Sequence, residues 1–229
     1  MTDLAIVPLA TPVQSATDQV FRSLYDAVIS LKLPPGAKVS EAEVAKQLNV
    51  SRQPVRDAFF RLSKLGFLSI RPQRATLITK ISEQAVLDAV FTRIALEVEC
   101  LRVALVRLTE GDLGNLHDNL ARQRKALNSA DPSEFYALDE AFHETLCEIA
   151  GHPHAWNLIQ EQKAHMDRVR FLTLSERRRR QVLTEHVALA EALEARDPVL
   201  AERCLRAHLT DIRTVLAALR KRYPEYFAI

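Results

Sequence analysis

Glycine is scarce in this chain, and long apolar runs are missing from it. Only 5 of the 229 residues are glycine and 48% are hydrophobic, which is typical of a compact helical protein and not of a disordered one. No uninterrupted apolar run approaches the ~20 residues of a membrane helix. Residues 1–15 lack the charged start of a secretory signal peptide, and Pro8 interrupts their short apolar stretch. We therefore expect a cytoplasmic protein with no membrane partner.

Cysteine is sparse as well. Cys100, Cys147 and Cys204 are odd in number, widely spaced and set among apolar residues. Such thiols are most simply reduced core residues of a cytoplasmic protein. Their spacing favours that interpretation over a metal or redox role.

Charge is divided unevenly along the chain, which is long enough for two domains. Residues 16–80 carry 11 Lys and Arg against 5 Asp and Glu, a net charge of +6, whereas residues 81–229 carry 20 against 23, a net charge of −3. A basic segment is expected of a DNA binder, because phosphate contacts supply the sequence-independent part of the affinity. We expect a flexible arm over 1–15, a DNA-binding domain over 16–80 and a second domain over 81–229.

Residues 40–65 predict two short helices joined by a tight turn. Ser40 and Glu43 have the spacing of a capping box at the start of the first helix. Asn49 falls in the turn and tolerates the left-handed conformation better than most residues. Ser51 can cap the second helix, and Pro54 falls in its first turn, where a missing N–H costs little. This is the pattern of a helix-turn-helix.

The outer face of the second helix carries side chains that can bind DNA. Arginine can bond a guanine edge bidentately and glutamine can bind adenine, although a solvated helical face is the alternative for an isolated motif. An amphipathic helix over 17–31 and two short strands around a basic turn over 67–78 favour DNA binding, because they complete a winged helix. The candidate DNA contacts are Ser51, Arg52, Gln53, Arg56 and, in the wing, Arg74.

From about Ser82 onward, apolar residues recur every three or four positions, as in amphipathic helices. Asp131-Pro132 and Asp197-Pro198 each place a capping residue before a proline at the first helical position. The pattern predicts an antiparallel bundle of six helices, over roughly 82–108, 112–128, 131–150, 154–174, 178–195 and 198–223. The expected fold is mainly α: a winged helix-turn-helix followed by a six-helix bundle.

Three helices of this bundle each direct a candidate metal ligand inward. Asp139 and His143 are spaced i,i+4 and share the apolar face of one helix, while His186 and His208 lie in line with apolar residues of two others. One carboxylate and three imidazoles suit a divalent ion such as zinc, nickel or manganese. The alternative for each histidine is a hydrogen-bonded core residue, and the sequence alone leaves both interpretations open.

The segments 33–41, 50–58 and 71–75, with the sequences LPPGAKVSE, VSRQPVRDA and RPQRA, resemble the GntR family of bacterial winged-helix regulators. The similarity is closest to its FadR-type subgroup, with a helical FCD ligand-binding domain of the shorter VanR-like type. It implies a homodimeric repressor of a metabolic operon that binds a double-stranded DNA operator through residues such as Arg52 and Arg56. It also implies a divalent metal ion bound by Asp139, His143, His186 and His208.

In this family, an arginine at the position of Arg93 can hold the carboxylate of a small-molecule effector. The alternative for Arg93 is an i,i+4 ion pair with Glu97. The run of arginines at 177–180 is interpreted as a solvated helix surface and not as a second nucleic-acid site.

Two other functions remain open. A divalent ion with free positions could activate water, as in a metalloenzyme fused to a DNA-binding domain. Because no general base can be assigned beside the four ligands, we expect no enzyme. The metal ion itself could also be the signal, in place of an organic acid.

Overall fold

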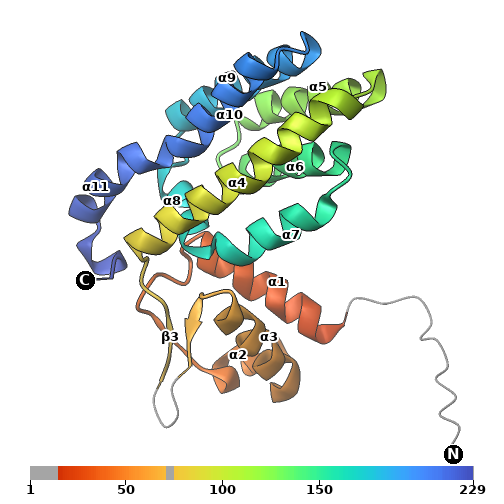
Figure 1. The fold of residues 1–229 in the computed structure, drawn as a ribbon. Coiled ribbons are helices and arrows are strands. Elements are labelled where there is room, and N and C mark those ends of the chain that lie inside the picture. Colours follow the sequence, from red (N-terminus) through yellow and green to blue (C-terminus); the bar gives the residue numbers. More distant parts are fainter. Residues whose placement is uncertain (1–14, 71–74, 229) are drawn as a thin grey trace, which may run out of the picture.

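The computed structural model describes residues 15–70 and 75–228, which are mostly helical, with one small sheet toward one end of the molecule (Figure 1). Of the predicted arm over 1–15, all but Ser15 lies outside the described residues. The first part of the chain forms the expected winged helix-turn-helix, which we call the head. Its elements are α1 (Ala16–Ile29), β1 (Lys38–Val39), α2 (Glu41–Gln47), α3 (Arg52–Lys64), β2 (Leu68–Ser69) and β3 (Thr76–Ile78).

The predicted turn between α2 and α3 is confirmed, but the capping box predicted at the start of α2 is wrong. Asn49 has a left-handed backbone, with φ of 53°, and Gly66 ends α3 with φ of 79°. Ser40 and Ser51 occupy the capping positions of α2 and α3, yet neither side chain caps an amide. Ser40 comes directly after β1, and its extended backbone continues that strand.

The sheet of the head is small and antiparallel, with strand order β1-β3-β2. Lys38 pairs with Leu77 and Leu68 with Ile78, so β3 lies in the middle. The wing tip, including Arg74, lies outside the described residues. The two described strands around it agree with the predicted wing.

The remainder of the described chain, which we call the body, is the expected antiparallel helical bundle. Two of the predicted helices are each divided in two, at Lys163 and at Asp211; neither residue is a glycine or proline, the usual sequence sign of a break. The helices are α4 (Glu83–Arg107), α5 (Glu110–Ala126), α6 (Ser133–Ile149), α7 (Pro153–Gln162), α8 (Ala164–Thr173), α9 (Glu176–Glu194), α10 (Pro198–Thr210) and α11 (Ile212–Arg222), followed by a 3-10 turn η1 (Pro224–Tyr226).

The predicted helix starts are correct to within two residues. Asp197 caps α10 by accepting from the amides of Val199 and Leu200, as its place before proline indicates. Asp131 accepts instead from the amide of Ser133, so that α6 starts one residue later than the sequence predicts.

The buried side chains form separate clusters in the head and in the bundle. A third cluster joins Ile81 to α4, α8, α11 and Phe227 near the C-terminus; Ile81 belongs to the linker between head and body, residues 79–82. The free thiols of Cys100 and Cys147 are buried and that of Cys204 is partly exposed, in agreement with the prediction. Within the described ranges, no helix has both the length and the apolar character needed to cross a bilayer.

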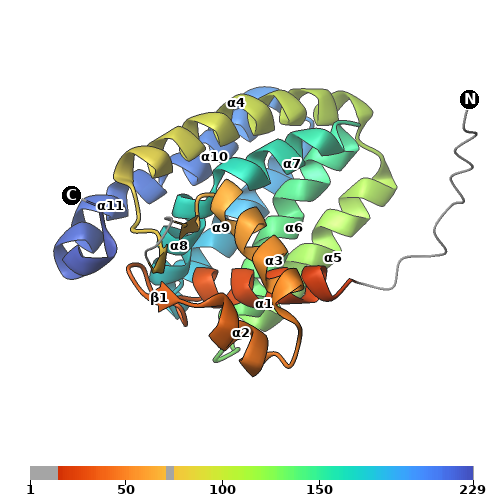
Figure 2. The same ribbon diagram turned by 90° about the horizontal axis from the view of Figure 1, so that it is seen from below.

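The linker between head and body is held from two sides. On one side, Arg168 of α8 donates to the carbonyl of Thr79 (2.5 Å) and His165 Nδ1 accepts from the amide of Ser82 (3.1 Å). On the other side, the amide of Ile81 donates to the carbonyl of Tyr226 (2.8 Å). Figure 1 shows the head below the body, and Figure 2, seen from below, shows α8 near the C-terminal end of α1.

We expect His165 to make the folded protein sensitive to acid. Burial, reinforced by the nearby Arg168, lowers the pKa of His165 from 6.5 to about 4. Protonation of Nδ1 would also remove the acceptor for the amide of Ser82. Since the unfolded chain takes up this proton first, His165 contributes stability above pH 6.5 that is lost as the pH falls toward 4, on the order of 3 kcal/mol at most.

Urea unfolding of wild-type and His165→Asn protein between pH 7 and 4.5 measures this contribution. The amide oxygen of Asn can still accept but does not titrate, so the variant should lose stability less steeply. Equal slopes for the two proteins would contradict the assignment.

Candidate functional site

Four buried side chains from three helices meet inside the body. Asp139 and His143 come from α6, His186 from α9 and His208 from α10. One ligand atom from each lies within 4.8 Å of the others, and none of the four side chains is exposed. The structure thus brings together all four residues that the sequence singled out as metal ligands.

The imidazoles face one another through the same ring atom. His143 Nε2 lies 3.1 Å from His208 Nε2, which in turn lies 3.4 Å from His186 Nε2. Asp139 Oδ1 is 3.7 Å from His186 Nε2. Three nitrogens and one oxygen therefore surround a single point.

Two of these histidines are oriented by carboxylates on their other ring nitrogen. His143 Nδ1 lies 2.7 Å from Glu97 Oε2 of α4, and His208 Nδ1 lies 2.7 Å from Glu185 Oε2 of α9. A carboxylate can only accept a hydrogen bond, so His208 Nδ1, which hydrogen-bonds to Glu185, carries the proton. The ionised carboxylate beside His143 Nδ1 favours the same tautomer there, although the two atoms are not aligned for a hydrogen bond. In neutral rings, each Nε2 then presents a lone pair to the common centre.

His186 follows the same rule with an amide partner. Its Nδ1 lies 3.0 Å from Gln123 Oε1, while Gln123 Nε2 donates to Asn119 Oδ1 (2.7 Å), which fixes the amide with its oxygen toward the ring. Hydrogen bonding of the outer nitrogen is the usual way in which proteins orient metal-binding histidines.

The electrostatics of the cluster also suit a cation. Burial lowers the pKa of His143, and it lowers the pKa values of His186 and His208 still further, with the neighbouring histidines adding to the effect. Although burial alone would raise the pKa of Glu97, Arg93 and His143 hold it well below its usual value. Neutral imidazoles beside ionised carboxylates are the donor set that a divalent ion requires.

Asp139 uses its two oxygens differently. Oδ1 faces the histidines, whereas Oδ2 accepts from Arg170 of α8. Arg170 also donates to Glu140 Oε1 (2.6 Å). Asp139 therefore has an outer partner just as the histidines do, and a metal ion at Oδ1 leaves that contact possible.

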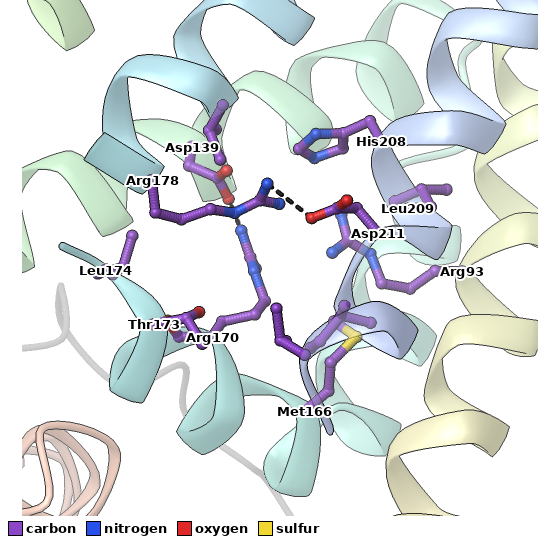
Figure 3. A pocket seen from close by; sticks show the side chains of 13 residues that line it. Arg93, Asp139, Met166, Arg170, Thr173, Leu174, Arg178, His208, Leu209 and Asp211 are labelled. Carbon is purple, nitrogen blue, oxygen red and sulfur yellow. Dashed lines mark hydrogen bonds and ion pairs between the residues drawn. The ribbon is translucent and has the colours of Figure 1, made fainter. Parts of the chain in front are cut away.

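A cavity of about 40 Å³ opens beside the cluster (Figure 3). Cationic side chains dominate its polar lining, and Arg178 forms an ion pair with Asp211 across it (2.6 Å). The charged and imidazole side chains that line it are Arg93, Asp139, Arg170, Arg178, His208 and Asp211.

Arg93 makes the expected ion pair, while its role in binding an effector stays a prediction. Its Nε donates to Glu97 Oε1 (2.5 Å), which is the predicted i,i+4 ion pair, and its side chain also lines the cavity. Nη2 is buried and has no hydrogen-bond partner among the described residues. An unpaired buried guanidinium nitrogen is costly, and an anionic ligand in the cavity would satisfy it.

The side chains predicted to contact DNA line the exposed surface of α3 and the residue before it. Ser51, Arg52, Gln53 and Arg56 are all exposed. Gln53 donates to Asp57 (2.9 Å) and Arg56 lies 3.6 Å from Glu41, so both are held loosely by side chains on the same surface.

Arg61 of the same helix turns elsewhere. It pairs with Asp18 of α1 (2.7 Å) and lies over the ring of Phe21. All three arginines are exposed, so it is the engagement of Arg61 with α1 that distinguishes it from Arg52 and Arg56 at the start of α3.

The arginine run at 177–180 has several separate tasks. Arg178 lines the cavity, and Arg179 is buried and donates to the carbonyl of Ser129 (2.9 Å). Arg180 pairs with Glu176 (2.7 Å), and Arg177 is exposed. The run is therefore not the uniform solvated surface that the sequence suggested.

The residues that hold the outer nitrogens and Asp139 Oδ2 were harder to predict from the sequence than the four ligands. Glu97 drew attention only as a partner of Arg93, and nothing in the spacing singled out Gln123, Glu185 or Arg170. Each comes from a different element and contacts the cluster only in the folded chain. Glu185 alone carried a signal, because it directly precedes His186.

Comparison with known proteins agrees with this architecture. Residues 16–78 match the family described as "Bacterial regulatory proteins, gntR family", and residues 88–211 match the FCD domain. The chain belongs to the GntR family. Like other members of this family, it is a DNA-binding transcriptional regulator with an FCD domain.

Several characterised proteins resemble this GntR-family chain. HTH-type transcriptional repressor RspR of Escherichia coli (strain K12) is 35% identical over 218 residues, which cover 95% of this chain and 96% of that protein. A probable D-xylose utilization operon transcriptional repressor of Paenarthrobacter nicotinovorans is 29% identical over 181 residues, 78% of each chain. The solved structure of E. coli McbR/YncC has the same fold, with a TM-score of 0.76, 23% identity and coverage of 92% of this chain and 100% of that one.

Removing an outer partner should weaken metal binding without removing a ligand. Loss of such partners commonly reduces metal affinity by roughly 10- to 100-fold. We expect this for Zn²⁺ binding by Glu185→Ala, because the ring of His208 would lose the acceptor that orients it. Competition with a chromogenic chelator measures the affinity.

Gln181→Ala is the matched control, since Gln181 lies one turn earlier on α9 and contacts Glu185 but none of the four residues of the cluster. The control should bind Zn²⁺ like the wild type. Equal affinities for both variants would show that Glu185 does not orient His208.

Proposed function

We propose that this regulator is a repressor that senses a small carboxylate through a divalent metal ion in its body. The observation that carries the proposal is the convergence of Asp139, His143, His186 and His208, in which each imidazole is fixed by a partner on its outer nitrogen. Neutral rings that turn their lone pairs toward one another repel, and a bound cation would convert that repulsion into coordination.

The donor set narrows the choice of metal. Three imidazoles and one carboxylate suit zinc, nickel or manganese better than calcium or magnesium, which prefer oxygen. When bound, the ion would supply positive charge and open positions for a ligand. The chain supplies the rest: Arg93 offers an unpaired nitrogen and Arg178 a second cation, so that the cavity favours an anionic ligand such as a carboxylate.

The head provides the DNA contacts. In this proposal, residues 16–80 bind the operator through Ser51, Arg52, Gln53 and Arg56 on the described surface and through Arg74 in the wing. A homodimer would place two heads on a pseudo-palindromic operator, with half-site spacing set by its two-fold axis. Two of the relatives are named as repressors, which supports repression of transcription by this chain as well.

Regulation follows from linkage. A ligand that binds the body more tightly in one arrangement of the heads shifts DNA affinity by that difference in binding free energy. The body, residues 81–229, is therefore the sensory part, and it needs no chemical turnover. Binding of candidate organic acids without their consumption is the expected behaviour, whereas turnover would favour a metalloenzyme.

Arg52→Ala and Arg56→Ala should each weaken operator binding. A lost base contact of this kind costs about 1–3 kcal/mol, or roughly 5- to 150-fold in Kd. The measurement is fluorescence anisotropy with a duplex selected by the wild-type protein from a random library.

Arg61→Ala is the matched control, because it removes an exposed arginine of the same helix that is engaged with Asp18 and Phe21. It should affect operator affinity much less than the other two substitutions. Similar losses for all three would mean only a general effect of charge.

The double variant His143→Ala/His208→Ala should no longer retain metal. Two of four ligands would be missing, and the remaining pair cannot hold a divalent ion against dialysis. Metal content after exposure to Zn²⁺, Ni²⁺ or Mn²⁺ is measured by elemental analysis.

The control is His117→Ala/His154→Ala, two exposed histidines outside the cluster. Stoichiometric metal in the first variant would refute the ligand assignment, while loss of metal in the control alone would point to a surface site.

A further inference from the structure

Helix α8 separates the cavity from the head, and its two faces serve different neighbours. Positions spaced by four and then three residues lie on one face of a helix. One such set lines the cavity: Met166, Arg170 and Thr173. The set displaced by two residues packs against the head cluster or its linker: Ala164, Arg168 and Phe171. A ten-residue helix thus contacts both the cavity beside the cluster and the core of the head.

On the cavity side, Arg170 is placed to respond to charge at the cluster. It holds Asp139 Oδ2, the oxygen that faces away from the histidines, and Glu140 Oε1 at 2.6 Å. Its Nη1 is also 3.9 Å from Asp167 Oδ1. Arg170 is largely buried, so its charge is poorly solvated and depends on these neighbours.

The start of α8 is tied to the same acidic group. Lys163, the residue between α7 and α8, is fully buried and contacts Glu140 and, at 2.7 Å, Asp167. Glu140 therefore bridges Lys163 and Arg170. These ion pairs fix α8 at its start and again about two turns later. A helix held in this way moves as a unit.

On the head side, Arg168 is fully buried and grips the linker. Nη1 donates to the carbonyl of Thr79 (2.5 Å), Nη2 lies 3.3 Å from Thr79 Oγ1, and the guanidinium lies over the ring of Phe67. Thr79 Oγ1 donates in turn to the carbonyl of Gly66 (2.6 Å), directly after α3. Arg168 is thereby linked through one residue to the end of the helix that is expected to enter the DNA groove.

We propose that α8 transmits the state of the cluster to the head, with Arg170 as its input and Arg168 as its output. The inference rests on the proposed metal site. A cation at Asp139 Oδ1 weakens the attraction between Asp139 and Arg170 and leaves Arg170 to Glu140 and Asp167. The resulting shift of α8 moves Thr79 through Arg168, and with it the C-terminal end of α3. Both arginines are positioning residues, because neither needs to touch the ion or DNA.

Arg168→Lys tests the output without altering the cluster. Lysine keeps a positive charge beside Asp167, but one ammonium cannot reproduce the planar contact with both oxygens of Thr79. Zn²⁺ alone is the probe, and operator Kd is measured with and without it on the library-selected duplex. Coupling between two sites is typically about 5- to 150-fold in affinity, and we expect a wild-type change in this range.

For Arg168→Lys we expect full Zn²⁺ stoichiometry but a change in operator Kd of less than about twofold on adding Zn²⁺. Arg102→Lys is the matched control, an exposed arginine of α4 that pairs with Glu99 and Glu202 far from α8. It should respond to Zn²⁺ like the wild type.

Thr79→Val is a second variant of the same contact, used in case Arg168→Lys does not fold. It keeps the side-chain volume and removes only the hydroxyl that joins Arg168 to Gly66. Hydrogen exchange of the amides at 76–82, which needs no DNA, gives a second readout. Zn²⁺ should change exchange there in the wild type and not in either variant.

The outcomes are distinguishable. If the wild type does not bind Zn²⁺, the proposed metal site fails and this inference fails with it. If the wild type binds Zn²⁺ and both variants respond like the wild type in Kd and in exchange, the metal site stands and the role of α8 is overturned. Zn²⁺ binding by the wild type without any change in Kd or exchange also overturns it and leaves the metal with a structural role.

Discussion

The organisation of the body depends on three imidazoles that turn the same ring nitrogen toward one point. Glu97, Gln123 and Glu185 fix this arrangement by taking the opposite nitrogen of each ring. Because ring and partner come from different helices in each case, orienting the rings also ties α4 to α6, α5 to α9 and α9 to α10. The buried charge of Arg93 fits the same scheme, since it balances Glu97 and still directs one nitrogen at the cavity. Apart from that nitrogen, polar side chains that would be costly singly are thereby paired within one network.

Hydrogen bonds between several elements also hold the junction of body and head. Rather than a flexible connection, the linker carries main-chain hydrogen bonds to α8 on one side and to the C-terminal segment on the other. A head held in this way can change its position only together with the elements that hold it. Small shifts at a packed junction are easily converted into a change of DNA affinity, because packed interfaces switch between discrete arrangements and do not deform smoothly.

Local patterns predicted most of the fold. Asn49 takes the left-handed turn, Gly66 ends α3, and Asp197 caps α10. Predictions failed where a distant partner decided. Ser40 follows a strand and does not form the capping box with Glu43, and α7 and α8 separate at a residue whose ammonium is drawn to Glu140 and Asp167. No local signal could have shown either, since both depend on contacts between elements far apart in the chain.

The sequence by itself determined which side chains face inward, because helical periodicity fixes direction relative to the apolar face. It therefore placed Asp139, His143, His186 and His208 on inward faces, which the family resemblance joined as one ligand set, and it placed Arg52 and Arg56 on the outer face of α3. Only the tertiary structure decided what surrounds them: the acceptors behind each ring, the division of Asp139 between the cluster and Arg170, and the engagement of Arg61 with α1. Periodicity specifies an angle about one helix axis, whereas these contacts depend on the relative position of several helices, which packing alone sets.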